Sequence, residues 1–246
     1  MDLGLDGRTA IVCGASSGIG LGIAESLARE GANVVMFARR GELLEEEAAR
    51  IGGLAVPGDV TNTADLERLV HTAVETYGGV DVVVHNSGGP HRAVATELDA
   101  QKVRDAVELL LVSIVQLTGL CLPHLERSAA GRIVTITSST VREPIDSLAL
   151  SNSIRPGIVG WSKSLARELG PKGITVNCIA PGRIDTERIR EVYPEGPSAD
   201  DLASIPLGRL GTTREVGDVV AFLCSERASY VSGTVLLVDG ALTRSL

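Results

Sequence analysis

The sequence predicts an α/β protein in which a parallel sheet is covered by helices on both faces. Three observations support this fold class. Short β-branched runs alternate with longer amphipathic segments along the chain, the runs are apolar at nearly every position, and the first run leads through several glycines into a helical pattern. Strands that are apolar throughout are buried on both faces, and helices between them keep the strands parallel.

Seven runs are predicted to be strands, and six segments between them to be helices. The strands cover residues 8–13, 33–37, 54–56, 80–85, 132–137, 175–180 and 234–238. The helices cover residues 19–30, 41–50, 63–77, 99–127, 153–169 and 215–225. In the fourth helix apolar residues recur at steps of three and four, which is typical of a helix packed on a sheet. This order predicts a single-domain Rossmann fold, a doubly wound seven-stranded parallel sheet that binds ligands at the carboxyl ends of its strands.

The composition limits the possible partners. At 246 residues with no linker-like stretch, we expect one domain over residues 1–246. Hydrophobic residues make up 44% of the chain and aromatic residues only 2%, so the core must consist of Val, Leu, Ile and Ala. The net charge of −8 leaves no basic stripe to neutralise phosphates, so we expect no nucleic-acid partner.

Cysteines, histidines and apolar runs predict a cytoplasmic protein without a metal. The four cysteines form no C-x-x-C pair, and the four histidines lack the spacing of metal ligands. Cysteines inside apolar runs are expected to be buried free thiols in a reducing compartment. No signal pattern opens the sequence, and no apolar run reaches the roughly 18 residues of a membrane span. We therefore expect no association with a membrane.

The turn after the first strand has the features of a dinucleotide site. Residues 14–20 follow the pattern G-x-x-x-G-x-G between a predicted strand and a predicted helix. Glycines permit close approach of the backbone to a pyrophosphate, and the free N–H groups of a helix start favour its negative charge. Such glycines can also form an ordinary turn, but the strand before and the helix after favour the cofactor. The predicted cofactor contacts are Gly14, Ser16, Ser17, Gly18, Ile19 and Gly20.

With further motifs in register, the chain resembles the short-chain dehydrogenase/reductase family along essentially its whole length. The turn is similar to the family's T-G-x-x-x-G-I-G, with Cys13 in place of Thr. Residues 59–60 resemble the family's adenine-contacting pair, residues 86–89 its N-N-A-G stretch, residues 181–182 its P-G turn and residues 237–240 its closing strand. The resemblance implies cofactor contacts at Asp59, Val60, Asn86, Ser87, Gly88, Pro181, Gly182 and Thr186, the last near the nicotinamide carboxamide.

Charge at the end of the second strand favours NADP(H) over NAD(H). An enzyme that uses NAD places an acidic residue there to accept hydrogen bonds from the ribose 2′-OH. This chain has Ala38 at that position, followed by Arg39 and Arg40. A guanidinium binds phosphate through paired hydrogen bonds and therefore suits a 2′-phosphate. The alternative is that the two arginines are a solvated pair on a loop.

The family's reaction depends on four side chains, Asn, Ser, Tyr and Lys, and this chain matches only the Ser. Alignment of Pro123 and of residues 160–169 with the family's helices puts Leu110 at the Asn position. The same alignment puts Ser151 at the Tyr position and Arg155 at the Lys position, and no Y-x-x-x-K occurs in the chain. The resemblance implies a catalytic site formed by Ser138, Ser151 and Arg155, with Arg155 also binding the cofactor.

These replacements are chemically serious. A cation can bring the pKa of a Tyr phenol down from about 10, whereas an aliphatic alcohol such as Ser151 starts far higher. An arginine at position 155 keeps the positive charge but stays protonated. General acid–base catalysis contributes about 10²–10⁴ in rate, so we expect ordinary ketone reduction to be slow. His91 and Tyr193 are alternative proton donors, each more simply a surface or packing residue. Ser139 and Asn152 are further hydrogen-bond partners for a substrate oxygen.

Two functions remain open. The first is an NADP(H)-dependent oxidoreductase with an altered proton donor, acting on a small carbonyl or alcohol of the kind that the resemblance to beta-ketoacyl-acyl carrier protein reductases implies. The second is a dinucleotide-binding sensor, scaffold or partner subunit without dehydrogenase activity. A different reaction in the same pocket has no support in the sequence. Residues 184–213, rich in Pro, Gly and acidic side chains, are predicted to form a lid over the substrate.

The resemblance also implies an oligomer. Members of the family form dimers or tetramers through two long helices, here residues 99–127 and 153–169. Apolar residues at Ile158, Val159 and Trp161 are expected to leave apolar surface on more than one side of the second helix, which needs a partner. We expect a homo-oligomer, a dimer or a tetramer, with a two-fold symmetric homotetramer preferred.

Overall fold

A computed structural model describes residues 2–193 and 195–245 of the chain. Within them lies one parallel sheet with the strand order β3-β2-β1-β4-β5-β6-β7. Its strands are β1 (Thr9–Cys13), β2 (Asn33–Ala38), β3 (Leu54–Pro57), β4 (Val82–His85), β5 (Arg132–Ile136), β6 (Thr175–Pro181) and β7 (Val235–Val238). The strand order reverses between β1 and β4, which is where a doubly wound sheet opens a crevice. The predicted Rossmann fold is confirmed.

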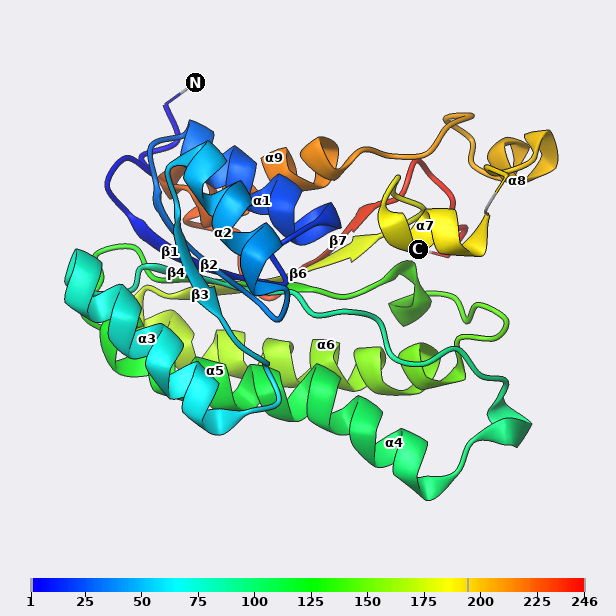
Figure 1. Ribbon diagram of the computed structural model, residues 1–246, viewed down its shortest axis with the longest axis horizontal. Coiled ribbons are helices and arrows are strands. Elements are labelled where there is room, and N and C mark those ends of the chain that lie inside the picture. The colour runs from blue at the N-terminus through cyan, green and yellow to red at the C-terminus, as the bar shows by residue number, and fades with distance from the viewer. Residues whose placement is uncertain (1, 194, 246) are drawn as a thin grey trace.

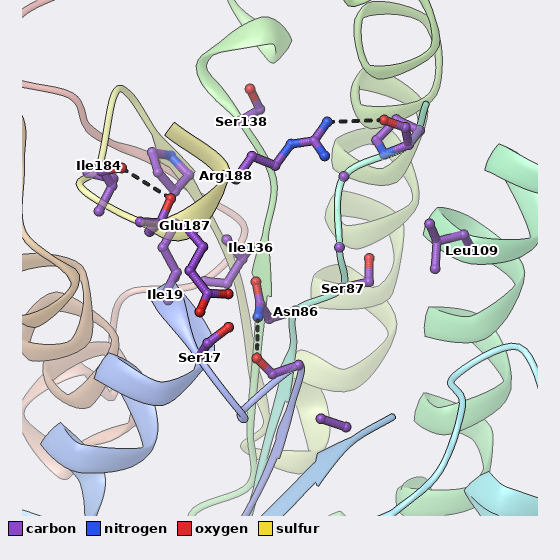
Figure 2. Close-up of a pocket in the computed structure, with 18 of the residues that line it drawn as sticks. Ser17, Ile19, Asn86, Ser87, Leu109, Ile136, Ser138, Ile184, Glu187 and Arg188 are labelled. Atoms are coloured by element: carbon purple, nitrogen blue, oxygen red, sulfur yellow. Dashed lines mark hydrogen bonds between the residues drawn. The ribbon is translucent and has the colours of Figure 1, made fainter. Parts of the chain in front are cut away.

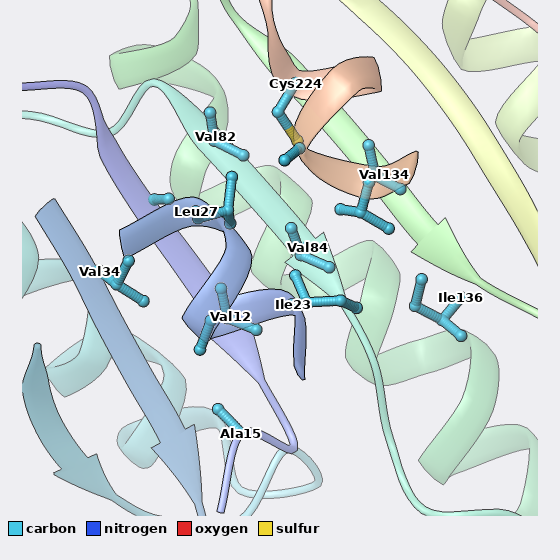
Figure 3. Close-up of a cluster of buried hydrophobic side chains, with 14 of the residues drawn as sticks. Val12, Ala15, Ile23, Leu27, Val34, Val82, Val84, Val134, Ile136 and Cys224 are labelled. Carbon is cyan, nitrogen blue, oxygen red and sulfur yellow. The ribbon is translucent and has the colours of Figure 1, made fainter. Parts of the chain in front are cut away.

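Helices cover both faces of the sheet (Figure 1). One face carries α1 (Gly18–Arg29), α2 (Gly41–Ile51) and α9 (Thr213–Cys224), and the other carries α3 (Thr63–Tyr77), α5 (Ser113–Leu125) and α6 (Ala149–Leu169). Successive strand residues point to opposite faces, so Ile11 and Val12 enter different cores. Figure 3 shows the core that contains Val12, which packs there with Ile23 and Leu27 of α1.

The long helix predicted over residues 99–127 is interrupted. It consists of α4 (Ala100–Val107), a π-helical segment η2 (Glu108–Val112) and α5. Such π-helical turns are rare and often occur at functional sites. The combined helix Ala100–Leu125 is long and apolar enough to cross a membrane by length and composition, a test that core helices of soluble proteins also pass. Here its α5 part packs against α3 and the sheet, as the fold requires.

The remaining elements are short. The predicted lid contains α7 (Glu187–Val192) and α8 (Ala199–Ala203). Four 3₁₀ turns complete the described structure: η1 (Ala95–Glu97), η3 (Ser139–Val141), η4 (Gly170–Lys172) and η5 (Glu226–Ala228). Helix α6 begins four residues before its predicted start. The loop after β4 holds the first residues of α6 in place. Ala93 of this loop accepts a backbone hydrogen bond from Ala149 and donates one to Ser147.

Of the three residues of α6 that were expected to leave apolar surface, Ile158 does not, whereas Val159 and Trp161 are half-buried. Ile158 is fully buried within the chain itself, in a third core cluster with Leu110 and Ile114, so it offers no surface to a partner. Trp161 is partly buried against the same cluster. The residues that do leave apolar surface on this side of the molecule include Val103 and Val115, which are 39% and 42% exposed. The oligomeric state itself stays a prediction.

Helices α1 and α9 approach each other closely at two glycines. A Cβ atom on Gly22 would lie 2.6 Å from the carbonyl oxygen of Thr213, and one on Gly217 would lie 2.3 Å from the carbonyl oxygen of Gly22. Because both obstacles are backbone atoms, they cannot move aside as a flexible side chain does. The contact holds α1, and with it the glycine turn, against the sheet.

We therefore expect Gly22→Ala to lower the free energy of unfolding by at least about 2 kcal/mol, because overpacking at an immobile contact separates the two helices. Urea unfolding followed by circular dichroism measures this loss. Gly41→Ala is the matched control, since its Cβ would meet Pro57 at an ordinary 3.6 Å, and we expect it to change stability by less than about 0.5 kcal/mol. Equal stabilities for the two variants would contradict the packing described here.

His85 ends β4 inside the core and is held neutral. Its Nε2 is 2.8 Å from the Thr118 hydroxyl of α5, and burial lowers the pKa of its imidazole from 6.5 to about 3. At pH 5 the unfolded chain binds a proton at this residue and the folded chain does not. Acidification therefore favours unfolding through His85, from the unfolded pKa of 6.5 downwards.

We expect the folded state to lose about 1.4 kcal/mol per pH unit through this group between about pH 6 and pH 4. His85→Gln, whose amide can still reach Thr118, should unfold with a correspondingly shallower dependence on pH over that range. Denaturant titrations at several pH values measure both slopes. Parallel slopes for the variant and the parent protein would show that His85 is not buried in its neutral form.

Candidate active site

A cleft of about 640 Å³ opens at the carboxyl ends of β1, β4, β5 and β6. Its volume is typical of sites for small molecules and cofactors. Every predicted cofactor residue except Gly20 lines it: Gly14, Ser16, Ser17, Gly18, Ile19, Arg39, Arg40, Asp59, Val60, Asn86, Ser87, Gly88, Arg155, Pro181, Gly182 and Thr186. The predicted catalytic residues Ser138 and Ser151 line the same cleft, so the fold brings the two sets together.

The glycine turn forms a cradle that only glycines fit. Gly14 has a positive φ of 61°, and a Cβ atom there would lie 2.7 Å from Nδ2 of Asn86, which donates a hydrogen bond of 3.2 Å to the Cys13 carbonyl oxygen. A Cβ atom on Gly20 would lie 2.1 Å from the Gly14 carbonyl oxygen. Gly20 does not line the cleft, and the absence of a side chain there lets the start of α1 approach the end of β1.

The start of α1 is left open toward the cleft. Ser17 is the N-cap residue of α1, and its side chain makes no capping hydrogen bond. The first N–H groups of the helix are consequently available, and with the helix dipole they attract an anion. A pyrophosphate fits this cradle because the backbone approaches it without side chains in between.

The arginines after β2 lie at one end of the cleft and already bind side chains. The Arg40 guanidinium donates to the Ser17 hydroxyl and to the Glu187 carboxylate of α7, the latter at 3.2 Å. Arg39 is 4.0 Å from the carboxylate of Asp59. Figure 2 shows Glu187 directed toward Ser17 at this end. Sequence reasoning missed Glu187, because it belongs to the lid and matches no motif.

The opposite wall of the cleft holds a buried arginine. Arg155 is 8% exposed, its Nε donates 3.1 Å to the Ser151 hydroxyl oxygen, and its Nη1 donates 3.0 Å to the Ile136 carbonyl oxygen. Burial lowers the pKa of this guanidinium to about 10, so it is charged at pH 7. Ser151 is 3.0 Å from the hydroxyl of Thr140. Since its oxygen accepts from Arg155, its own proton is free to point to Thr140 or into the cleft.

Ser138 and Leu110 occupy two other positions that the family resemblance assigned. Ser138 lines the cleft and also begins η3, because its hydroxyl oxygen accepts a hydrogen bond of 3.2 Å from the Thr140 backbone. Leu110 is buried in the π-helical segment and does not line the cleft. It borders a small cavity behind the cleft together with His85 and Arg155. The Asn position is thus filled by an apolar side chain.

The other candidate groups lie outside the cleft. Among the described residues, neither His91 nor Tyr193 lines it: His91 is exposed, and the Tyr193 hydroxyl bonds to Asp201 of α8. The Asn152 side chain is engaged at both ends by the Ile145 backbone, at 3.2 and 2.9 Å. Ser139 is buried beneath the turn. His91 and Tyr193 therefore do not line the cleft, in agreement with their simpler interpretation as surface or packing residues.

The predicted lid contributes to the cleft through its first part. Ile184, Thr186, Glu187, Arg188 and Ile189 line it. Arg188 reaches from α7 toward the loop after β4, where its guanidinium donates 3.3 Å to the carbonyl oxygen of Pro90 (Figure 2). Like Glu187, Arg188 was missed by sequence reasoning, since a charged residue on a lid carries no signal of the direction in which it points.

Comparisons with known proteins agree with this geometry. A family model described as enoyl-(acyl carrier protein) reductase matches residues 14–243. The 3-oxoacyl-[acyl-carrier-protein] reductase FabG of Vibrio cholerae serotype O1 is 34% identical over 242 residues, which cover 98% of this chain and 99% of the relative. Dehydrogenase/reductase SDR family member 4 of Oryctolagus cuniculus is 32% identical, over 98% of this chain and 95% of the relative.

Solved structures are similar over the whole chain. L-sorbose reductase from Gluconobacter frateurii, in complex with NADPH and L-sorbose, has a TM-score of 0.92 at 30% identity, with 100% of both chains covered. An NADPH-bound short-chain oxidoreductase from Pseudomonas aeruginosa PAO1, described as containing an atypical catalytic center, has a TM-score of 0.92 at 29% identity, with 99% of both chains covered. The protein thus belongs to the short-chain dehydrogenase/reductase family of NAD(P)-dependent oxidoreductases.

Proposed function

We propose that this protein is an NADPH-dependent reductase of a small carbonyl compound, with Ser151 and Arg155 at the positions that the family resemblance assigns to Tyr and Lys. One observation carries the proposal. The cleft that has the glycine cradle and Arg40 at one end has Ser138, Ser151 and Arg155 on its opposite wall. A 3-oxoacyl thioester is one substrate class to test, because FabG proteins are similar along the whole chain.

The residues of the cleft fit NADPH. The cradle at Gly14 and the open start of α1 would hold the pyrophosphate, and Arg40 with Arg39 would bind the 2′-phosphate, which is the basis for preferring NADP(H) to NAD(H). Arg155 would donate to the nicotinamide ribose. The bound cofactor supplies a hydride to the carbonyl carbon of the substrate.

At the reacting end, the chain's own groups hold the carbonyl oxygen. The hydroxyl of Ser138 donates a hydrogen bond to this oxygen, and the charge of Arg155 in the same cleft stabilises the negative charge that develops as the carbonyl is reduced. The proton that completes the alcohol comes from water and passes through the Ser151 hydroxyl, whose oxygen is fixed by Arg155. Arg155 stays protonated throughout, because its pKa is about 10.

A second function, dinucleotide binding without turnover, has one observation in its favour. The hydroxyl of Ser151 is engaged by Arg155 and Thr140, and no side chain that titrates near neutrality lines the cleft among the described residues. The absorbance of NADPH, followed with a panel of ketones, 3-oxoacyl thioesters and short-chain oxo acids, separates the two. Oxidation of NADPH with a carbonyl substrate supports the reductase, whereas tight NADPH binding without turnover on the panel supports the second function.

We further propose that the protein is a cytoplasmic homo-oligomer, a dimer or a homotetramer. All four cysteines are buried free thiols, as a reducing compartment favours. The exposed Val103 and Val115 lie on the long helix that the family resemblance places at the interface. A small-molecule substrate remains the expected partner of the cleft.

The double variant Ser151→Tyr with Arg155→Lys is expected to raise the kcat for simple ketones by about 10²–10⁴, because it supplies a phenol beside a cation as general acid. Initial rates of NADPH oxidation measure the change. The same pair combined with Ser138→Ala is the matched control and should lose most of the gain, since the carbonyl oxygen loses a donor. An unchanged rate in the double variant would count against the assigned position of the site.

Glu187 competes with the cofactor phosphate for Arg40, so Glu187→Gln is expected to lower the Kd for NADPH by about 2- to 5-fold. Arg40→Ala is expected to raise that Kd by roughly 10-fold or more, since a charge-assisted contact is lost. Calorimetric titrations measure both. NADH, which lacks the 2′-phosphate, is the control ligand, and its Kd should stay within about 2-fold. A Kd for NADPH that neither substitution alters would exclude Arg40 as the phosphate ligand.

A further inference from the structure

We propose that the carbonyl substrate of this cleft carries a carboxylate close to its reacting carbonyl, and that Arg188 of the lid and Arg155 of α6 bind it. The substrate class is then a short-chain oxo acid. This inference rests on the proposed function, because it takes the same cleft to be the carbonyl-binding site.

The charges of the cleft are divided between its two ends. At the end near Arg40, the acidic residues Asp59 and Glu187 accompany the two arginines after β2. At the opposite end the charged residues that line the cleft are Arg155 and Arg188. No ion pair between described residues involves either of these two. The substrate end therefore has positive charge without a counter-charge, in a protein whose net charge is −8.

Arg155 is buried without a carboxylate partner, as Arg132 also is, but Arg155 lines the cleft and Arg132 does not. The two hydrogen bonds of Arg155 go to neutral acceptors, the Ser151 hydroxyl and the Ile136 carbonyl, and use two of the five N–H groups of a guanidinium. A buried charge is unfavourable unless it is paired. The pKa of Arg155 is lowered first by burial and also by the positive charge of Arg188, which lines the same cleft. An anion bound between the two arginines would neutralise the buried charge of Arg155 and reduce its repulsion by Arg188.

Arg188 is positioned for this role by the loop after β4. Its guanidinium donates to the Pro90 carbonyl oxygen at 3.3 Å and lies against Gly89, where a Cβ atom would be only 3.1 Å from its Cζ. Gly89 has no positive φ, and a side chain there would require the guanidinium of Arg188 to shift by a few tenths of an ångström. Figure 2 shows Arg188 pointing away from the direction of Glu187, toward the Pro90 side of the cleft.

Apolar side chains also line the cleft, among them Leu109, Leu148, Ile184 and Ile189, and they suit a short apolar chain on the oxo acid. A carboxylate accepts two parallel hydrogen bonds from a guanidinium, which an ester or a thioester cannot do with the same charge. A phosphorylated ketone would offer the same anionic chemistry, and the experiment below includes it as a separate arm.

The test compares matched pairs of substrates with NADPH: 2-oxobutanoate against its methyl ester, and dihydroxyacetone phosphate against dihydroxyacetone. We expect kcat/KM for 2-oxobutanoate to exceed that for its ester by at least about 10-fold. Arg188→Met should lower the value for the acid by about 10- to 100-fold and leave the ester within about 3-fold. Arg188→Lys should restore part of the loss.

Arg190→Met is the matched control on the same helix, because Arg190 pairs with Asp185 at 3.2 Å and does not line the cleft. Arg190→Met should leave kcat/KM unchanged for both 2-oxobutanoate and its methyl ester. Arg188 is exposed, so its removal leaves the core intact. Equal kcat/KM for the acid and the ester would overturn the inference while the reductase function stands. If kcat/KM differed between dihydroxyacetone phosphate and dihydroxyacetone but not between 2-oxobutanoate and its ester, the assignment of a carboxylate would be overturned.

A binding measurement covers the case in which no carbonyl is reduced. Oxamate, a carboxylate that resembles an oxo acid, is titrated into the protein saturated with NADP⁺ in a calorimeter. Binding that Arg188→Met weakens and Arg190→Met preserves would support the anion site even if the proposed reductase function failed. Absence of oxamate binding to the folded, NADP⁺-bound protein would overturn the inference.

Discussion

The close contact of Gly14, Gly20 and Asn86 at the ends of β1 and β4 is the constraint on which the site depends. Three segments meet there with backbone atoms where side chains would otherwise stand, so a Cβ atom on Gly14 or Gly20 would overlap its neighbours. The contact aims the open start of α1 into the cleft. It also fixes the direction in which the loop after β4 leaves the sheet, and that loop supports Arg188 through Pro90.

The fold and most of the residues that line the cleft could be predicted from the sequence because they depend on local patterns. Apolar runs identify the buried strands, and glycines identify the turn between β1 and α1. Parallel strands then bring their carboxyl ends to one edge of the sheet. The lid contacts could not be predicted this way. Glu187 and Arg188 are adjacent in sequence yet serve opposite ends of the cleft, which depends on how α7 lies over it.

The errors of prediction have physical causes as well. The helical spacing of Ile158 predicts an exposed apolar side chain. The π-helical segment around Leu110 packs against Ile158 and buries it. Asn152 looked available to a substrate, but it closes a loop through the Ile145 backbone. A segment distant in sequence buries Ile158, whereas the backbone seven residues earlier engages the Asn152 side chain.

A serine and an arginine at the positions that the family resemblance assigns to Tyr and Lys would change the chemistry of the site more than its shape. Arg155 and Ser151 are hydrogen-bonded to each other and lie where the resemblance puts a phenol and an amine. A permanent cation that cannot release its proton near neutrality suits the binding of negative charge better than proton transfer. The proposed carboxylate and the slow reduction of simple ketones follow from the same property.

The central claim is that the cleft binds a phosphorylated nicotinamide dinucleotide, and a calorimetric titration of the folded parent protein with NADPH and with NADP⁺ tests it most directly. The account predicts one site per chain, with NADPH bound more tightly than NADH. Absence of binding heat with either phosphorylated dinucleotide at several temperatures, on protein shown to be folded by circular dichroism, would contradict it.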